Sequence, residues 1–487
     1  MISSENVLAK ATIRGTIWNY VSYMSGRLVA LVSMLVLARL LSKDDFGVAA
    51  YAGVATGFID VIAGLGISNA VIYYKDEEGI FDTAFWLNMA SSLVIFTIAW
   101  FGAPLAGVFF NDPRATSVLQ VLAFTYPVAA IGYIHGALLQ KQLAFGKRFV
   151  PSLTGAISKA LISIPMAYMG YGYWSIVYGQ IGSQIITTIS YWIILSWRPT
   201  FRYIRTFTKP LLTYGLSLVF SDFLSSIVNQ TDFLIIGRTL GAVALGIYSL
   251  AFRIPEIMIQ MFCSAVASVI FPIFTSVQDD LETLKRGFLK TTQYMVLIVM
   301  PIGLGLALDA KPIILIFLSE KWLDAIPVIR AIAVFSLVQT IPYSAGVVYK
   351  ARGRQYILII ITIIQFLLVA PSIYWVTVTY GSIEYVAWTQ VVTSSLITVL
   401  SLVIAVRIIN ASVMDIARAL APSVIAGLFL TISVLCVLFL TQQMSSFVQL
   451  GLSIIVGAAF YIGAVYLVNR DIIIQMLRIL RGSLSRG

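Results

Sequence analysis

Residues 38–52 read ARLLSKDDFGVAAYA, and residues 237–251 read GRTLGAVALGIYSLA. At an offset of 199 residues, three identical pairs coincide: Arg39 with Arg238, Gly47 with Gly246 and Ala52 with Ala251. Long apolar segments flank both copies. A repeat of this kind in an apolar chain indicates a membrane bundle of two related halves, an arrangement typical of transporters with a pathway between the halves.

The composition excludes a soluble globular protein. Hydrophobic residues make up 59% of the 487 residues and charged residues only 11%, whereas soluble domains contain about 25% charged residues. Apolar runs such as 296–308 and 357–375 are continuous, unlike the alternating segments of about 10 residues in an outer-membrane barrel. Ile17–Leu41 is too long for a signal-peptide core and is expected to be the first span. The sequence therefore predicts an all-α integral membrane protein.

Apolar segments separated by Gly, Pro and charged residues predict fourteen transmembrane helices. Their expected bounds are 16–40, 45–67, 83–110, 115–138, 149–170, 173–196, 210–238, 243–275, 288–317, 324–349, 355–378, 382–408, 418–440 and 446–468. The connections between them are short. Two basic amphipathic segments, Asp279–Lys290 and Arg470–Arg486, are expected to lie on the inner membrane surface.

Charge placement predicts the orientation. An even number of spans puts both termini on one side, and most of the 32 Lys and Arg residues then fall on that same side. The opposite side holds only Arg39, Lys43, Arg114, Arg238, Lys311 and Lys321. By the positive-inside rule, the N- and C-termini are expected in the cytoplasm. The same distribution explains the net charge of +11 without a nucleic-acid partner, for which a soluble basic face would be needed.

The repeat continues beyond the opening motif. Further matched pairs are Pro104 with Pro312, Phe109 with Phe317, Ile131 with Ile341, Tyr133 with Tyr343, and Gly136 with Gly346. Matched positions fall on the same side of the membrane, so the sequence predicts parallel repeats in a 6 + 6 + 2 arrangement. The basic linker Trp197–Pro210 separates the halves. The expected domains are 1–197, 198–409 and 410–487.

The pattern R-x-L-x-x-x-x-F/L-G in both copies, together with FPIFTSVQDDLETLKRGF (271–288) and FLSEKW (317–322), resembles the multidrug/oligosaccharidyl-lipid/polysaccharide (MOP) exporter superfamily. Within it, the chain is most similar to the Wzx-type polysaccharide flippases of the WzxC-like kind. The resemblance covers essentially the whole chain. It implies a MATE/MOP-like fold, with two pseudo-symmetric lobes around a central cavity and a lipid-tail groove on the last two helices.

The resemblance also implies a function. Such flippases move undecaprenyl-diphosphate-linked oligosaccharide repeat units across the bacterial inner membrane for exopolysaccharide, capsule or O-antigen synthesis. They work by alternating access, with a cation gradient or the membrane potential as the expected energy source. The expected coupling ion is H+ or Na+, and no other cofactor is expected. Membrane lipids, a polymerase and the export machinery are the expected partners.

Charged residues inside the predicted spans are the candidate site residues, because a charge at bilayer depth costs a few kcal/mol. The cations expected to bind the diphosphate or an acidic sugar in the cavity are Arg27, Lys159, Arg253 and Arg330. The carboxylates expected to act in coupling or gating are Asp60, Asp222, Asp232 and Glu256. Each of these charges could instead pair with another; Arg253 and Glu256, three residues apart, face the same way on a helix.

Other functions fit the sequence less well. A membrane-embedded polymerase or glycosyltransferase would need a large outer loop or an acidic catalytic pair, so no enzyme activity is expected. A multidrug antiporter shares the fold but normally has twelve spans. A lipid II flippase remains an alternative. The two cysteines, Cys263 and Cys436, lie in apolar segments, and with a single histidine no metal site is expected.

Overall fold

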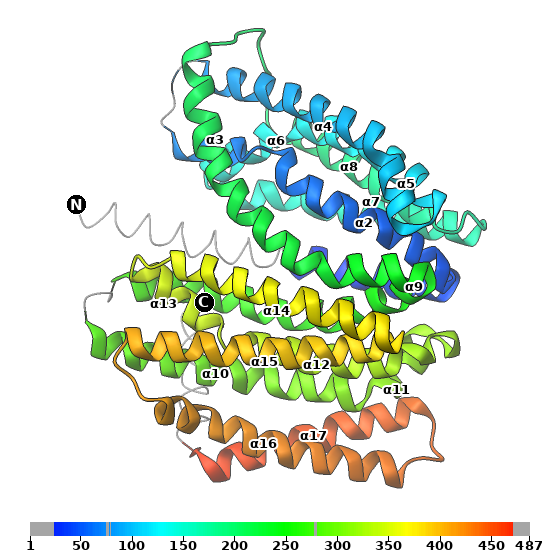
Figure 1. Ribbon diagram of the computed structural model, residues 1–487, viewed down its shortest axis with the longest axis vertical. Coiled ribbons are helices and arrows are strands. Elements are labelled where there is room, and N and C mark those ends of the chain that lie inside the picture. Colours follow the sequence, from blue (N-terminus) through cyan, green and yellow to red (C-terminus); the bar gives the residue numbers. More distant parts are fainter. Residues whose placement is uncertain (1–23, 75–76, 78, 277–279, 471–487) are drawn as a thin grey trace. The chain divides into compact units, whose positions relative to one another are not determined.

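A computed structural model describes residues 24–74, 77, 79–276 and 280–470, and the regular structure in these residues is helical throughout (Figure 1). The chain forms two compact units, Met1–Ser249 and Leu250–Gly487. We call them the first and the second unit. The division into domains at residues 197 and 409 stays a prediction.

The first unit consists of helices joined by short connections. They are a helix over residues 24–40, α2 (Lys43–Ala63), α3 (Ile67–Tyr73), α4 (Ile80–Phe110), α5 (Pro113–Ala123), α6 (Thr125–Lys141), α7 (Phe145–Tyr168), α8 (Trp174–Ile194) and the first part of α9 (Arg205–Ser276). Gly241 interrupts α9 with φ 81° and ψ −173°. This interruption confirms the break predicted between spans 210–238 and 243–275.

The second unit contains the rest of α9 and a bundle of further helices. These are α10 (Leu281–Leu308), α11 (Ala310–Ile313), the π-helical turn η1 (Ile314–Leu318), the 3₁₀ turn η2 (Glu320–Ala325), α12 (Ile326–Thr340), α13 (Tyr343–Ala351), α14 (Tyr356–Tyr380), α15 (Ile383–Ile408), α16 (Val413–Leu440) and α17 (Ser446–Val468). Helices α16 and α17 lie side by side and pack on α10. In the predicted 6 + 6 + 2 arrangement they are the last two spans.

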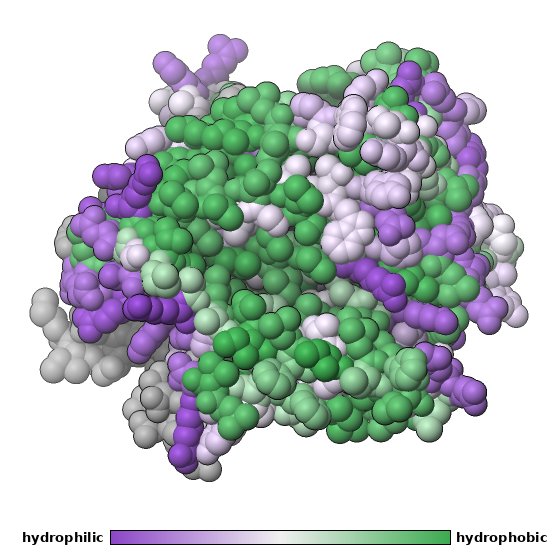
Figure 2. Space-filling view, turned by 60° about the horizontal axis from the view of Figure 1, so that its bottom comes forward, coloured by the Kyte–Doolittle hydropathy of each residue, from purple (hydrophilic) through white to green (hydrophobic). Residues whose placement is uncertain are grey.

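Eleven helices of the described residues are long and apolar enough to cross a membrane, so this is a multi-pass membrane protein. Apolar side chains dominate the face drawn in Figure 2. Three reasons explain why eleven helices are found where fourteen spans were predicted. The first predicted span is described only over 24–40, and the seventh and eighth are joined in α9. The sixth corresponds to α8, which carries too many polar residues to be counted. The fourteen-span arrangement therefore stays a prediction.

Two predicted boundaries were wrong. The predicted span 45–67 is broken after Ala63 by Leu65 and Gly66, whose φ angles are 42° and 63°. The amphipathic segment Asp279–Lys290 is not a separate helix, because α10 runs unbroken from Leu281 to Leu308. Its Leu284 and Phe288 are fully buried against Phe274 and Tyr349, and this packing makes the segment the start of a long helix. The C-terminal segment predicted over Arg470–Arg486 lies outside the described residues except for Arg470.

A tyrosine of α17 fills a gap in the hydrogen bonds of α10. Pro301 has no N–H, so the carbonyl of Leu297, four residues earlier, loses its helical donor. The Tyr461 hydroxyl donates to that carbonyl at 2.8 Å. An unpaired carbonyl in an apolar interior costs more than a typical hydrogen bond gains. The bond therefore fixes α17 against α10 at the proline.

The two copies of the motif meet in the first unit. A Cβ placed on Gly47 would lie 1.8 Å from the Ala242 carbonyl oxygen, and one on Gly246 would lie 2.0 Å from the Lys43 carbonyl oxygen. In the repeat, Lys43 matches Ala242 and Gly47 matches Gly246. The glycine of each copy therefore faces the same position of the other copy. This reciprocity is the pattern of a two-fold contact. Only glycine allows the two backbones to approach so closely.

Candidate functional site

Several polar side chains of the first unit meet where α7 and α8 pack together. The Ser183 hydroxyl donates to the Gly155 carbonyl at 2.7 Å, and the hydroxyls of Thr154 and Ser190 lie 3.0 Å apart. A Cβ on Gly155 would lie 2.2 Å from the Thr187 hydroxyl oxygen. Small residues let helices pack closely in membranes, and hydroxyl groups hydrogen-bond between them. The α7–α8 pair is therefore a polar, closely packed element within a mostly apolar unit.

Lys159 lies on this polar interface. Its Nζ donates to Gln180 Oε1 at 2.6 Å, so the ammonium group of α7 is held by a neutral amide of α8. The Lys159 side chain is half-buried. The contact orients a cation near the middle of α7.

Arg27 lies on the helix over 24–40 and is also half-buried. A Cβ on the neighbouring Gly26 would lie 3.8 Å from the Ser152 hydroxyl, so this helix passes the start of α7. From Ser152 to Lys159, α7 rises by about 10 Å. The two predicted cations of the first unit therefore belong to neighbouring helices. Arg27 lies beside the start of α7, about two helical turns before Lys159 along α7.

Asp60 lies on α2 and is exposed. Its carboxylate is next to Tyr126 and within electrostatic range of Tyr133, both on α6. The Tyr126 side chain is only 4% exposed. The arrangement places an accessible carboxylate beside two phenols, a group that could carry a proton or a sodium ion.

Asp222 and Asp232 share the first part of α9 but have different surroundings. Asp222 is exposed. Asp232 is 1% exposed, and its carboxylate accepts a hydrogen bond of 2.7 Å from the Tyr248 hydroxyl and one of 2.9 Å from the Phe233 N–H. Tyr248 lies beyond the break at Gly241, so the Asp232–Tyr248 bond connects the two parts of α9. Such a bond favours a structural brace.

In the second unit, Arg253 and Glu256 form the ion pair expected from their spacing, with 3.2 Å between Arg253 Nη1 and Glu256 Oε2. Arg330 is exposed on α12. Among the described residues, no ion pair or hydrogen bond joins Arg330 to that pair. The described residues also contain no group of three or more His, Cys, Asp or Glu side chains able to hold a metal ion.

The neutral partners of these charges were not predicted from the sequence. Gln180, Tyr126 and Tyr248 are the polar side chains that surround Lys159, Asp60 and Asp232. One sequence pattern could have predicted Gln180 as the partner of Lys159. Polar residues recur on α8 at the spacing of one helical face: Gln180, Ser183, Gln184 and Thr187. The roles assigned to the eight charged residues stay predictions.

The family described as "Polysaccharide biosynthesis protein" matches residues 36–327. The teichuronic acid biosynthesis protein TuaB of Bacillus subtilis is 25% identical over 391 residues, which are 80% of each chain. The succinoglycan biosynthesis transport protein ExoT of Rhizobium meliloti is 28% identical over 348 residues, 70% of each chain. The lipopolysaccharide biosynthesis protein WzxC of Escherichia coli is 24% identical over 369 residues, 75% of each chain.

Solved structures with the same fold are transporters. The lipid II flippase MurJ in an inward closed conformation superposes with a TM-score of 0.71 and 16% identity, covering 94% of this chain and 100% of MurJ. An inward-facing multidrug resistance MATE transporter of the MOP superfamily gives a TM-score of 0.61 and 16% identity, covering 80% and 94% of the two chains. At this identity the likeness extends to the fold alone.

Proposed function

The chain belongs to the polysaccharide biosynthesis protein family, and from this membership we propose that it is a flippase for lipid-linked oligosaccharides rather than an enzyme. Its substrate is an undecaprenyl-diphosphate-linked repeat unit destined for exopolysaccharide, capsule or O-antigen. The observation that carries the proposal is the family match, which spans both copies of the motif. Relatives named for teichuronic acid, succinoglycan and lipopolysaccharide synthesis support the substrate class.

The proposed architecture is fourteen spans in a 6 + 6 + 2 arrangement, in the bacterial inner membrane with both termini in the cytoplasm. Two lobes around a central cavity alternate between inward and outward access. The fold shared with MurJ and MATE transporters supports this arrangement. The last two spans, α16 and α17, pack together as one apolar hairpin. We assign to this hairpin the groove for the polyprenyl tail.

Within this scheme, Lys159 and Arg27 bind the diphosphate. A diphosphate needs cationic donors in a watery cavity, where Arg binds in a bidentate manner and Lys as a point charge. The 2.6 Å bond from Lys159 to the Gln180 amide supports the assignment, because it orients the ammonium group at the middle of α7. Arg253 and Arg330 are the corresponding cations proposed for the second unit.

Asp60 is the proposed coupling residue, with Asp222 as the second candidate, because both are accessible on their helices. The coupling ion is H+ or Na+. Reconstituted protein in liposomes with a pH or sodium gradient tests this part. Transport that is independent of both gradients would remove the coupling role of Asp60, Asp222, Asp232 and Glu256 without affecting substrate binding.

The test of the main proposal is genetic and chemical. In the native host, deletion of the gene is expected to stop polymer export and to leave lipid-linked repeat units in the inner leaflet. Lys159→Gln and Arg27→Gln are expected to restore less than about a tenth of wild-type export at normal expression. The matched control is Lys209→Gln, which removes a cation of the basic linker and is expected to restore export fully.

The same experiment separates the alternatives. If wild-type protein rescued a strain depleted of its lipid II flippase and the deletion left polymer export intact, the substrate would be lipid II. If the deletion changed only resistance to cationic drugs, the chain would be a multidrug antiporter. Full export by both Lys159→Gln and Arg27→Gln would leave the flippase in place but refute the proposed diphosphate site.

A further inference from the structure

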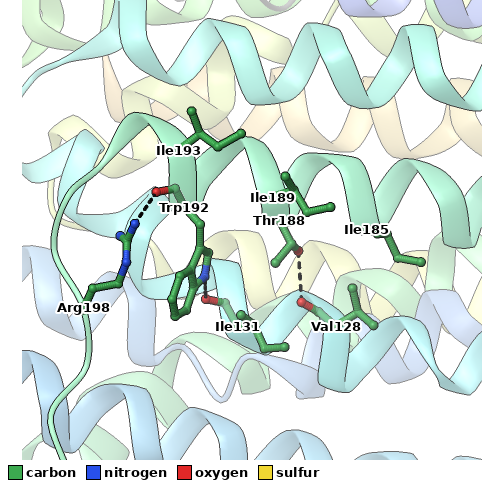
Figure 3. A pocket seen from close by; sticks show the side chains of 8 residues that line it. All are labelled: Val128, Ile131, Ile185, Thr188, Ile189, Trp192, Ile193 and Arg198. Atoms are coloured by element: carbon green, nitrogen blue, oxygen red, sulfur yellow. Dashed lines mark hydrogen bonds between the residues drawn. The ribbon is translucent and has the colours of Figure 1, made fainter.

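An apolar groove of about 600 Å³ runs between α6 and α8 in the first unit (Figure 3). By the 3.6-residue period of α8, its groove-lining residues face away from Gln180 and Thr187. Its lining is Val128, Ile131, Ile185, Thr188, Ile189, Trp192, Ile193 and Arg198. Ile193 is 78% exposed and Ile189 47%. The volume falls in the range of pockets that hold small ligands, roughly 300–1,000 Å³.

Hydrogen bonds to α6 fix the α8 wall of the groove. Trp192 Nε1 donates to the Ile131 carbonyl at 2.9 Å, and the Thr188 hydroxyl donates to the Val128 carbonyl at 3.0 Å (Figure 3). His135 stacks beneath Trp192 with 5.0 Å between the ring centroids. These bonds satisfy the polar atoms of Thr188 and Trp192, so the groove presents hydrocarbon to whatever occupies it. Between Ile185 and Ile193 it follows about 12 Å of helix.

Arg198 closes one end of the groove with a positive charge. Its guanidinium lies 4.8 Å from the Trp192 ring centroid and donates to the carbonyls of Leu195 at 2.7 Å, Trp197 at 2.8 Å and Trp192 at 2.9 Å. These three bonds cap the end of α8. An arginine has five N–H donors, so two remain for an outside acceptor, and Arg198 is exposed. Among the described residues, no carboxylate pairs with it.

We propose that this groove binds an anionic phospholipid of the surrounding bilayer, with one acyl chain along Ile185, Ile189 and Ile193 and the phosphate on Arg198. Charge complementarity selects this occupant. An arginine with two free donors matches a phosphate, which accepts bidentate bonds from guanidinium, and the apolar wall matches the chain attached to it. Arginines at the ends of membrane helices are expected at headgroup level. The site lies apart from the proposed diphosphate cations and does not depend on them.

The test uses the full chain in nanodiscs of phosphatidylglycerol and phosphatidylcholine, doped with a photoactivatable analogue of either lipid. The photoreactive group is on the acyl chain. The phosphatidylglycerol analogue is expected to label peptides containing 128–131 and 185–193 at least 5-fold more than the phosphatidylcholine analogue. Arg198→Gln is expected to remove that preference, and Arg198→Lys to keep part of it.

Because Arg198 also caps α8, a second variant keeps the test informative if Arg198→Gln fails to fold. Ile189→Trp fills the groove and leaves the arginine, and it is expected to lower labelling by both lipids at these peptides. The matched control is Leu161→Trp on α7, an exposed apolar position outside the groove, which is expected to change nothing. Equal labelling by the two lipids in the wild type, or unchanged labelling in Ile189→Trp, would overturn the proposal. So would native mass spectrometry showing a dimer that Ile189→Trp dissociates, because a second copy of the chain would then occupy the groove.

Discussion

In the first copy of the motif, α2 begins at a polar cap, whereas the same position of the second copy is a glycine inside α9. Ser42 and Asp45 form a capping box, with the Ser42 hydroxyl accepting from the Asp45 N–H at 3.1 Å and Asp45 accepting from the Ser42 N–H at 2.9 Å. The counterpart of Ser42 is Gly241, which breaks α9 with a φ of 81°. In both copies the helix is interrupted at the same position of the repeat, by a capping box at Ser42 in the first copy and by the backbone conformation of Gly241 in the second.

The polar bonds around the copies differ in the same way. In the first copy, Asp44 pairs with Arg114 of α5, and Asp45 accepts from the Tyr173 N–H at 2.8 Å. Their counterparts in the second copy are apolar, and there the buried Tyr248 bonds Asp232 instead. What both copies keep is the contact of Gly47 and Gly246. The repeated residues therefore preserve a close backbone approach, and the differing residues attach each copy to its own neighbours.

The largest expected effect comes from breaking the shared contact. Gly47→Ala and Gly246→Ala each place a Cβ about 2 Å from a backbone carbonyl, at 1.8 Å and 2.0 Å, so the two helices must separate. Overpacking of this kind costs about 1–3 kcal/mol or more. Both variants are expected to lose thermal stability in detergent by similar amounts and to lose most polymer export.

The control for this prediction is Gly53→Ala on the same helix α2. A Cβ there meets nothing within 4 Å, and alanine in a helix interior is favoured over glycine by about 0.5–1 kcal/mol. Gly53→Ala is expected to be as stable as the wild type or more so. If Gly47→Ala and Gly246→Ala behaved like Gly53→Ala, the reciprocal contact would not exist.

The next largest effect tests the bond specific to the second copy. Asp232→Asn removes the charge of the buried acceptor, and Tyr248→Phe removes the hydroxyl that donates to it. Each substitution disrupts the buried bond, which costs about 1–3 kcal/mol. The double variant is expected to lose less than the sum of the two, because both substitutions remove the same interaction. Thermal unfolding of all four proteins measures this coupling.

The same series separates a brace from a coupling site. If Asp232 only braces α9, export by Asp232→Asn falls in proportion to protein stability and keeps its dependence on the ion gradient. Loss of gradient dependence in a well-folded Asp232→Asn protein would instead assign the coupling ion to this carboxylate.

The corresponding bond of the first copy is expected to contribute less. Asp45→Ala removes the acceptor for the Ser42 N–H, which is one half of the capping box, and the acceptor for the Tyr173 N–H; the Ser42 hydroxyl still caps α2. Loss of a capping bond costs about 0.5–2 kcal/mol. A stability loss of about 1–2 kcal/mol is expected, and Asp45→Asn is expected to recover part of it because its amide oxygen can still accept one of these N–H bonds. An unchanged unfolding temperature for Asp45→Ala would mean that the bonds accepted by Asp45 do not stabilise the start of α2.

The sequence predicted the helices better than their contacts. Apolar segments separated by Gly, Pro and charged residues located most of the helical segments and the break at Gly241, because such a pattern depends on local residue type. The break at Leu65 was missed, because a short turn inside an apolar stretch leaves no gap in hydropathy. The reciprocal contact of Gly47 and Gly246 joins residues 199 positions apart, and repetition alone does not say that two copies touch.

The candidate site was predictable only in part. Intramembrane charges are visible in a sequence because they are rare there, and this made Lys159 and Asp232 candidates. Their partners Gln180 and Tyr248 are ordinary polar residues, and only packing of one helix on another selects them. Arg198 was predicted only as part of a basic linker. The groove beside it is formed with α6, more than 50 residues earlier in the chain, so the local sequence does not reveal it.

A smaller effect is expected at the ion cluster of the first copy, and it depends on pH. The hydrogen bonds from Arg114 hold the pKa of Asp112 below its ordinary value. A lowered pKa stabilises the fold above the ordinary pKa, about 3.9, and this stability is lost as the pH falls through the lowered pKa. Because Arg114 is partly exposed, with a side-chain exposure of 37%, the contribution is under about 1 kcal/mol.

Unfolding temperatures of the wild type and Asp112→Asn between pH 7 and pH 3 check this sign. Asp112→Asn is expected to be less stable at pH 7, and the difference is expected to shrink as the pH falls below about 4. A difference that grew towards low pH would show that Asp112 is not stabilised as a carboxylate.

The smallest effect is expected just beyond the second copy, at Arg253 and Glu256. Their pair is 3.2 Å long, but the Arg253 side chain is 61% exposed, and such i, i+3 pairs contribute about 0.2–0.5 kcal/mol. Arg253→Gln and Glu256→Gln are therefore expected to leave stability nearly unchanged.

Export then becomes the informative measurement for Arg253 and Glu256. If Arg253 binds substrate, Arg253→Gln lowers export while Glu256→Gln, which releases the arginine, does not. If the pair acts as a gate, both variants change export equally, and the charge reversal Arg253→Glu with Glu256→Arg restores it.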